Sequence, residues 1–447
     1  MKPCRMRMGP DMPSLQNAEI EFHRDPRPSY RWIWSGVAVV VLWFSASVAA
    51  AQTADTVPRV AYFQEAIQSD FFGVDARSMA MGNTGIVTAN DGSAIISNPA
   101  NLARIRRIEL RFGLSHARVA NDSRIKTGDQ VYDGGQSLRK TRINALSLAI
   151  PVPTYRGSLV FAFGFNRVNS FDRAAGLEYP PPPGYAAITA REAEAGGLWK
   201  WTASGAVDVS PRLSAGISAH LLTGKDEYDW RQVFRSNDPA QTWIDDQSIN
   251  IDYLGLAGTA GATYAISRAL TAGVVLETPT YLAAEESYPG YPDSGASYSI
   301  TRPFAFGVGV SGVTSHLTMT GDLRYSDWSQ LEISYDSPSL SNISDQQFMA
   351  ENLREAISWH FGAEYLFPAQ GVNLRAGYFL DPLPIARHYI ESQRQYMTFG
   401  AGFLFDRVMV LDLAYVTGGY ELRNTNSIDS LEKYKIRRVF LTIGYRI

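Results

Sequence analysis

Charged side chains on three neighbouring segments are the groups in this chain best placed to do chemistry. They occupy alternate positions of apolar runs: Asp322, Arg324, His360, Glu364 and Arg375. Alternate side chains of an extended segment share one face, so these groups are expected to point into a common interior. There, Arg324 or Arg375 could bind a substrate carboxylate through paired hydrogen bonds. The alternative is a ladder of charges that neutralise one another and stiffen that interior.

Two serine–histidine pairs also share a face, because each pair is separated by one residue. They are Ser218 with His220 and Ser358 with His360. No nucleophile elbow, glycine-rich phosphate loop or metal-ligand spacing accompanies them. We therefore expect no catalytic residue, no metal site and no cofactor.

The elements that position these groups are extended segments that run from about Arg107 to the last residue. In the first of them, Ile108, Leu110 and Phe112 alternate with Glu109 and Arg111. Each segment has the length of roughly 9–11 residues that a tilted strand needs to cross a bilayer, and about fourteen such segments follow one another. The pattern predicts an all-β protein: a single transmembrane antiparallel β-barrel over residues 107–447. A secreted all-β protein is the alternative.

Connectors of alternating length support the membrane barrel, in which short turns face the periplasm and long loops face outward. Long connectors are expected over residues 121–138, 171–197, 227–246, 286–296, 329–352, 382–393 and 421–433. The formal net charge of −3 and the absence of a Lys/Arg block give no reason to expect nucleic acid as a partner.

The N-terminal residues have the pattern of an export signal. Arg24, Arg27 and Arg31 precede an apolar stretch over 32–51, which ends in three alanines before Gln52. This predicts a signal peptide over 1–51 with cleavage near Ala51, although an uncleaved anchor helix would have the same length. The single cysteine of the chain, Cys4, would be removed with it, so the mature chain would hold no thiol.

Residues 52–106 lack the strand pattern and carry several motifs instead. These are Gly73-Val74-Asp75-Ala76-Arg77-Ser78-Met79-Ala80-Met81-Gly82, Ala89-Asn90-Asp91-Gly92-Ser93-Ala94 and Asn98-Pro99-Ala100-Asn101-Leu102-Ala103. The block resembles the N-terminal region of the long-chain fatty-acid transporter (FadL-like) family of outer-membrane barrels, and weaker echoes follow along the mature chain.

The resemblance implies a barrel of about fourteen strands with an N-terminal hatch in its lumen, formed by residues 52–106. It also implies capture of hydrophobic molecules among outer loops, transfer to a lumenal pocket and exit through a lateral gap in the wall. Asn98, Pro99 and Ala100 match the family's hatch motif, and a rigid proline corner could move as a gate. A plain turn is the alternative.

Apolar side chains in two regions are candidate ligand contacts. In the hatch these are Phe63, Phe71, Phe72, Met79 and Met81, and in the outer loops Trp230, Phe234, Trp243, Tyr288 and Tyr291. An exposed aromatic cluster marks a capture site or a contact surface. Equally, the hatch residues could wedge against the wall and the loop residues could pack on one another.

The sequence therefore predicts a passive outer-membrane transporter of hydrophobic small molecules, either long-chain fatty acids or aromatic hydrocarbons. Expected partners are these molecules, the lipid and lipopolysaccharide of the outer membrane, and the barrel-assembly machinery. The alternatives are a FadL-like barrel that serves protein secretion as a partner or cargo shuttle (PorV-type), and a structural or adhesive barrel.

Overall fold

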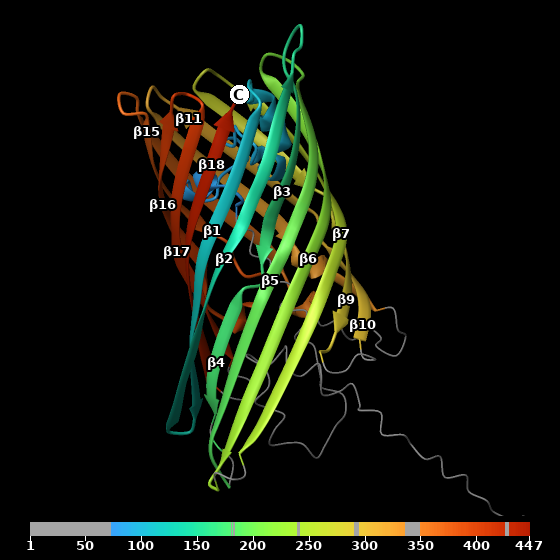
Figure 1. Ribbon diagram of the computed structural model, residues 1–447, viewed down its shortest axis with the longest axis vertical. Helices are drawn as coiled ribbons and strands as arrows, with labels where there is room; N and C mark the ends of the chain where they lie inside the picture. Colours follow the sequence, from blue (N-terminus) through green and yellow to red (C-terminus); the bar gives the residue numbers. More distant parts are fainter. Residues whose placement is uncertain are drawn as a thin grey trace, which may run out of the picture.

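A computed structural model shows a tall barrel of antiparallel strands (Figure 1). It describes residues 73–179, 181, 184–238, 242–289, 295–335, 349–424 and 429–447. The predicted signal peptide and residues 52–72 of the predicted hatch, with Phe63, Phe71 and Phe72, lie outside the described residues, as does Tyr291. Among the described residues, no helix has the length and apolar character needed to cross a membrane.

The described strand segments form one sheet that makes a closed fourteen-stranded barrel, as the alternating pattern predicts. Ten crossings are single strands: β1 (Glu109–Thr127), β2 (Gln130–Val152), β5 (Tyr185–Asp208), β6 (Leu213–Ser236), β7 (Trp243–Ala265), β14 (Glu355–Phe367), β15 (Val372–Leu380), β16 (Ile390–Phe405), β17 (Met409–Asn424) and β18 (Asp429–Arg446). Four crossings are each interrupted: β3 (Leu159–Ser170) with β4 (Arg173–Tyr179), β8 (Leu270–Glu277) with β9 (Thr280–Ser287), β10 (Gly295–Arg302) with β11 (Ala305–Val313), and β12 (Leu317–Asp327) with β13 (Glu332–Tyr335).

The first and last strands close the barrel. β1 pairs with β18 along its length, from Glu109 opposite Arg446 to Lys126 opposite Asp429. On its other side β1 pairs with β2. Closure leaves no free edge between the two ends of the chain, which a bilayer requires because unpaired backbone groups find no water there.

The two faces of the strands differ as the sequence predicts. In β1, Leu110 and Phe112 are exposed on the outer wall, while Glu109 and Arg111 are buried in the lumen. Farther along the same outer face, the exposed side chains become His116 and charged residues. The apolar band therefore covers the half of each long strand nearest the short turns, and the other half extends beyond it.

Four of the expected long connectors, 121–138, 171–197, 227–246 and 421–433, are mostly strand, which corrects the sequence-based assignment there. Residues 121–138 belong to the β1–β2 hairpin, whose turn lies at Gly128, and residues 185–197 belong to β5. Trp230 and Phe234 lie within β6, and Trp243 begins β7. Outside the bilayer both faces of a strand can be polar, so the apolar alternation ends although the hydrogen-bonded ladder continues.

One seam interrupts the wall. β2 pairs with β3 only from Val152 to Ala145, which lies opposite Asn166. Beyond that point β4 pairs with β5 and contacts β1 and β2 without pairing with them. The Ser123 hydroxyl of β1 donates to the Gly176 carbonyl of β4, and Arg142 of β2 forms an ion pair with Asp172 at the β3–β4 break (Nη2–Oδ1 2.8 Å).

Residues 73–106, called the inner segment below, lie inside the barrel near the end that holds the C-terminus (Figure 1). They form the short helices α3 (Ala76–Ala80) and α4 (Ala94–Ser97) and the 3-10 helix η3 (Pro99–Arg104). α3 contacts β15 to β18, whereas η3 contacts β3 and β5 to β7. The inner segment therefore joins opposite walls. Two further 3-10 helices, η5 (Trp328–Gln330) and η7 (Arg387–Tyr389), lie in connections of the barrel.

Candidate functional site

The Asn-Pro-Ala element ties the inner segment to the wall. The Asn98 side-chain amide donates to the Ile86 carbonyl at 2.8 Å and approaches the Val274 carbonyl of β8 at 3.3 Å, while its oxygen accepts from the Ala100 amide. All these groups are buried or partly buried. Asn98 thus caps η3 and holds two parts of the inner segment against β8.

Two wall glycines make room for this element. A Cβ at Gly261 of β7 would lie 1.9 Å from the Asn98 Oδ1, and one at Gly216 of β6 would lie 2.5 Å from the carbonyl carbon of Pro99. Both distances are far below van der Waals contact. The fit of Asn98 and Pro99 against β6 and β7 therefore requires glycine on the lumenal face.

A buried group of charges, called the inner network, connects α3 and the following turn to β1, β14, β15 and β17. Arg111 contacts Asp75 at 2.6 Å, Asp91 at 3.0 Å and Asp412 at 3.2 Å. The other pairs are Arg77–Glu364 (3.0 Å), Arg375–Glu364 (2.6 Å), Arg375–Asp412 (2.7 Å), Arg111–Glu109 (3.7 Å) and Arg446–Glu109 (2.6 Å), the last of which adds β18 to the network.

Five carboxylates of the inner network face four guanidinium groups. Burial raises the pKa of Asp75 to about 6, assisted by Asp91 and Asp412 and opposed by Arg111. Burial also acts to raise the pKa of Asp91, but Arg111 and Arg77 outweigh it and hold that pKa below its ordinary value. One proton taken up at Asp75 would balance the charges of the network.

Other predicted inward residues hold the inner segment as well. The Asp322 carboxylate accepts from the backbone amides of Gly85 (2.7 Å) and Ile86 (2.9 Å). The His360 Nδ1 lies 2.9 Å from the Gly82 carbonyl. These contacts show why the charges recur on one face: they fix backbone groups that would otherwise be buried without partners.

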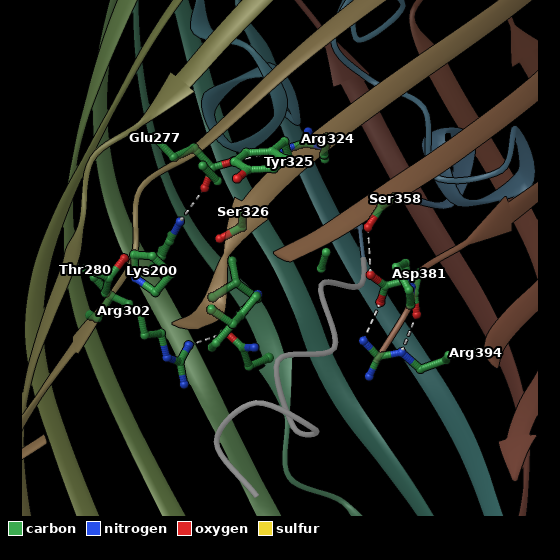
Figure 2. A pocket seen from close by; sticks show the side chains of 18 residues that line it. Lys200, Glu277, Thr280, Arg302, Arg324, Tyr325, Ser326, Ser358, Asp381 and Arg394 are labelled. Carbon is green, nitrogen blue, oxygen red and sulfur yellow. Dashed lines mark hydrogen bonds and ion pairs between the residues drawn. The ribbon is translucent and has the colours of Figure 1, made fainter. Parts of the chain in front are cut away.

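Beyond this level, farther from the short turns, a pocket opens inside the barrel (Figure 2). It lies where the strands break: Asn169 precedes the β3–β4 interruption, Thr280 follows the break between β8 and β9, Pro303 separates β10 from β11, and Trp328 begins the interruption between β12 and β13. Pro303 has no amide hydrogen to donate to the ladder. Interrupted pairing at one height gives the pocket its room.

Charged side chains from several strands line the pocket together with apolar ones. Among the described lining residues, the cations are Lys200, Arg302, Arg324 and Arg394, the acids are Glu277 and Asp381, and the apolar side chains include Val168, Leu222, Trp328 and Ala356. Four cations therefore face two carboxylates.

Figure 2 shows how these charges are arranged. Glu277 accepts from Arg324 at 2.8 Å and lies 3.9 Å from the Lys200 ammonium nitrogen. On the other side of the pocket, Asp381 pairs with Arg394 at 2.7 Å and accepts from the Ser358 hydroxyl at 3.0 Å. The two carboxylates thus orient Arg324 and Arg394, and the cations that line the cavity outnumber the acids by two.

The predicted carboxylate contacts separate into two places. Arg324 lines the pocket, whereas Arg375 is buried in the inner network with Glu364 and Asp412. The change occurs within β12 itself, because Asp322 holds the inner segment while Arg324, two residues on, reaches the pocket.

The serine–histidine pairs have separate partners. Ser358 donates to Asp381 while His360 contacts the Gly82 carbonyl. Ser218 donates to the Ile95 carbonyl, and the His220 ring lies between Thr202 and Thr259. Neither histidine is placed to take a proton from its neighbouring serine. Among the described residues, no group of three or more His, Cys, Asp and Glu side chains is arranged to hold a metal ion.

The predicted apolar contacts that the structure describes lie away from this pocket. Met79 and Met81 are fully buried in α3 and the residue that follows it. Trp230 and Tyr288 are buried in an apolar cluster at the far ends of the strands, and Phe234 packs against it. Trp243 is 55% exposed and its ring lies 4.6 Å from that of Phe234.

Sequence reasoning missed Lys200, Arg302, Glu277, Asp381 and Arg394. Each lies in a different strand or connection, so no local pattern groups them. The available signal was proline. Pro279 and Pro303 interrupt otherwise regular strand patterns, Pro382 follows the end of β15, and all three positions adjoin the pocket.

Comparison with known proteins decides the family. The sequence profile of the family described as Outer membrane protein transport protein (OMPP1/FadL/TodX) matches residues 64–430. The chain belongs to this family. The barrel is accordingly an outer-membrane protein, as the strand pattern predicts, and the family is one of transport proteins rather than enzymes.

Solved structures share the fold at low sequence identity. The chain is similar to a Pseudomonas aeruginosa FadL homologue (15% identity, TM-score 0.58, covering 83% of this chain and 98% of that one). It is also similar to the toluene transporter TodX of P. putida (14%, 0.55, 85% and 99%) and the toluene transporter TbuX of Ralstonia pickettii (16%, 0.55, 85% and 99%). No curated protein matches the sequence.

Proposed function

We propose that this barrel carries long-chain amphiphiles with an acidic head group, such as fatty acids, passively across the outer membrane. The observation that carries the proposal is the lumenal pocket, where apolar side chains stand beside four cations and two carboxylates. A neutral hydrocarbon would use only the apolar part of this lining. An acidic head group would use the positive charge as well.

Desolvation makes both kinds of lining necessary for such a substrate. Moving an alkyl chain into water costs about 0.8 kcal/mol per CH₂ group, so a carrier must offer apolar contacts along the route. A carboxylate in the same pocket loses its hydration and needs charged partners in return. Lys200 and Arg302 are the proposed partners, because both line the pocket. The Lys200 ammonium nitrogen lies 3.9 Å from Glu277, beyond hydrogen-bond distance, whereas Arg324 and Arg394 each pair with a carboxylate at 2.8 Å or less.

The seam between β2 and the β3–β4 crossing supplies a lateral exit in this proposal. Val168 and Asn169 of β3 line the pocket, and the β3–β4 break follows directly. At the seam the wall is held by side chains rather than by a backbone ladder, with Asp172 paired to both Arg142 and Arg167 at 2.8 Å. A movement of the inner segment, with Asn98-Pro99-Ala100 as its corner, would open the path to the pocket from the end of the barrel that holds the short turns.

Uptake of labelled substrates by cells without their own long-chain fatty-acid transporter tests the proposal. Expression should raise uptake of a long-chain fatty acid more than that of an alkylbenzene. Replacing Lys200 and Arg302 by glutamine should lower fatty-acid uptake roughly tenfold, the value of one charge-assisted hydrogen bond, and leave alkylbenzene uptake nearly unchanged.

Lys225→Gln with Arg231→Gln provides the matched control, since both side chains are exposed on the outer face of β6 and each pairs with a carboxylate there. A secretion partner predicts no uptake of either substrate above background. Equal uptake by the pocket variant and the control would overturn the role of the pocket.

A further inference from the structure

Three arginines form a row across the outer wall where the closed barrel joins its first and last strands. Arg118 of β1 lies directly opposite Arg139 of β2 on one side and Arg437 of β18 on the other. All three side chains are exposed, and in β1 the neighbours Ala117 and Val119 are buried on the lumenal side. The row therefore faces away from the lumen.

These arginines have no acidic partner among the described residues, whereas the charges beside them do. Lys435 pairs with Asp122 at 2.7 Å, and Arg124 with Asp133 at 2.7 Å. No ion pair within the described chain includes Arg118, Arg139 or Arg437. Like charges directly opposite one another destabilise a sheet, so an external anion is the group that would balance this row.

The height of the row is that of lipid head groups. Arg118 lies ten residues beyond the exposed Ile108, which corresponds to about 33 Å along a strand and, at a tilt of about 40°, to about 25 Å across the membrane. This equals the height of the apolar band of such barrels. Between the two lie Leu110, Phe112 and Leu114 on the same face.

A groove continues from the row over β17. Arg437 lies opposite Thr417, and Lys435 lies opposite Gly419. Together with Met397 and Tyr378, Thr417 and Gly419 line a depression bordered by Lys435 and by the ion pair of Lys433 with Glu421. A Cβ at Gly419 would lie 1.9 Å from the Tyr434 carbonyl oxygen, so the floor of the groove is backbone.

We propose that this arginine row binds the phosphate of a phosphorylated outer-leaflet lipid, such as the lipid A part of lipopolysaccharide. Guanidinium groups suit phosphate because their planar fork donates two parallel hydrogen bonds. The exposed apolar side chains Ile143, Val439 and Leu110 on the membrane side of the row offer contact to acyl chains. The groove gives space for the sugar that carries the phosphate.

Lipid retention by the purified full-length chain tests the site. The protein is incubated with phosphorylated lipid A in detergent, and bound lipid is counted by native mass spectrometry. The variant Arg118→Gln, Arg139→Gln, Arg437→Gln should lose about tenfold or more of the retained lipid. The control Arg124→Gln, Lys225→Gln, Arg231→Gln removes the same charge from exposed outer positions and should retain it.

Two further measurements show whether the arginine row recognises the phosphates of the lipid. Lipid A stripped of its phosphates should bind the native chain as weakly as phosphorylated lipid A binds the arginine variant, and millimolar inorganic phosphate should not displace bound lipid A. If the arginine variant does not reach the outer membrane, it is refolded in detergent and its heat-modifiable mobility is checked first. Equal retention by the two triple variants, or equal binding of the dephosphorylated lipid, would overturn the proposal without affecting the transport proposal.

Discussion

The lumen near the short turns and the lumen at the strand breaks use charge in different ways. Near the turns, the strands are continuous, and the five carboxylates of the inner network pair with four arginines, so that one proton at Asp75 completes the balance. At the breaks, four cations face two carboxylates beside apolar side chains. Matched charges hold two parts of the chain together, whereas an excess of one sign is suited to a charged ligand.

The same strands contribute to both regions. Along β12, Asp322 binds the amides of Gly85 and Ile86, and Arg324 lines the pocket. Along β14, His360 contacts Gly82 and Ser358 lines the pocket. On both strands, two residues, about 7 Å along a strand, separate the side chain that holds the inner segment from the side chain that lines the pocket.

Arg111→Met should have the largest effect, because it leaves Asp75, Asp91 and Asp412 buried without their common partner. Removing one member of a buried ion pair costs about 3–5 kcal/mol. We expect loss of folded protein in the outer membrane, measured by heat-modifiable mobility in gels. The control Arg124→Met lies on the same strand in an exposed pair and should shift stability by less than about 1 kcal/mol. Normal folding of Arg111→Met would contradict the role of the inner network.

Gly261→Val should displace the inner segment while the barrel still forms. Its Cβ would overlap Asn98, and overpacking of this kind costs about 1–3 kcal/mol. We expect increased permeation of small sugars through reconstituted protein, measured by liposome swelling. Gly312→Ala is the control, because a Cβ there meets no other atom within 4 Å. Unchanged permeation in Gly261→Val would show that Asn98 does not hold the inner segment in place.

These two variants also show what the sequence could and could not reveal. Alternating side chains predict the strands and the lumenal face of Asp322, Arg324, His360, Glu364 and Arg375, because period two is a local property. The partners of those charges could not be predicted, since Arg375 meets Asp412 and Arg77 meets Glu364 across long separations in the chain. The motif residues Asn98 and Pro99 were recognisable, but their fit against Gly216 and Gly261 needed the register of β6 and β7.

Asp172→Asn should loosen the seam without unfolding the barrel. Asp172 pairs with Arg142 across the seam and with Arg167 within its own crossing, both at 2.8 Å. Deuterium exchange should rise for the amides over residues 166–173 and remain unchanged in β17. Asp133→Asn, which removes an exposed pair with Arg124, is the control. Equal exchange in the two variants would show that the ion pairs of Asp172 do not hold the seam closed.

The pH dependence of the inner segment should be the smallest effect. The pKa of Asp75 is raised from 3.8 to about 6, mainly by burial. A raised pKa means that the folded protein holds a proton which the unfolded chain has lost, so this stabilisation is complete below about pH 4 and is lost as the pH rises through 6. After correction for the intrinsic rise of amide exchange with pH, deuterium exchange of α3 should therefore increase from pH 5 to pH 7, and Asp75→Asn should flatten the increase. A steeper change in Asp75→Asn would contradict the assignment.

The density of a bound long-chain fatty acid in an experimental structure of this barrel would test the proposed binding in the lumenal pocket most directly. We expect the carboxylate to lie within hydrogen-bond distance of Lys200 or Arg302, with the alkyl chain against Val168, Leu222 and Trp328. An empty pocket at saturating ligand, or a fatty acid bound with its carboxylate turned away from these cations, would contradict it.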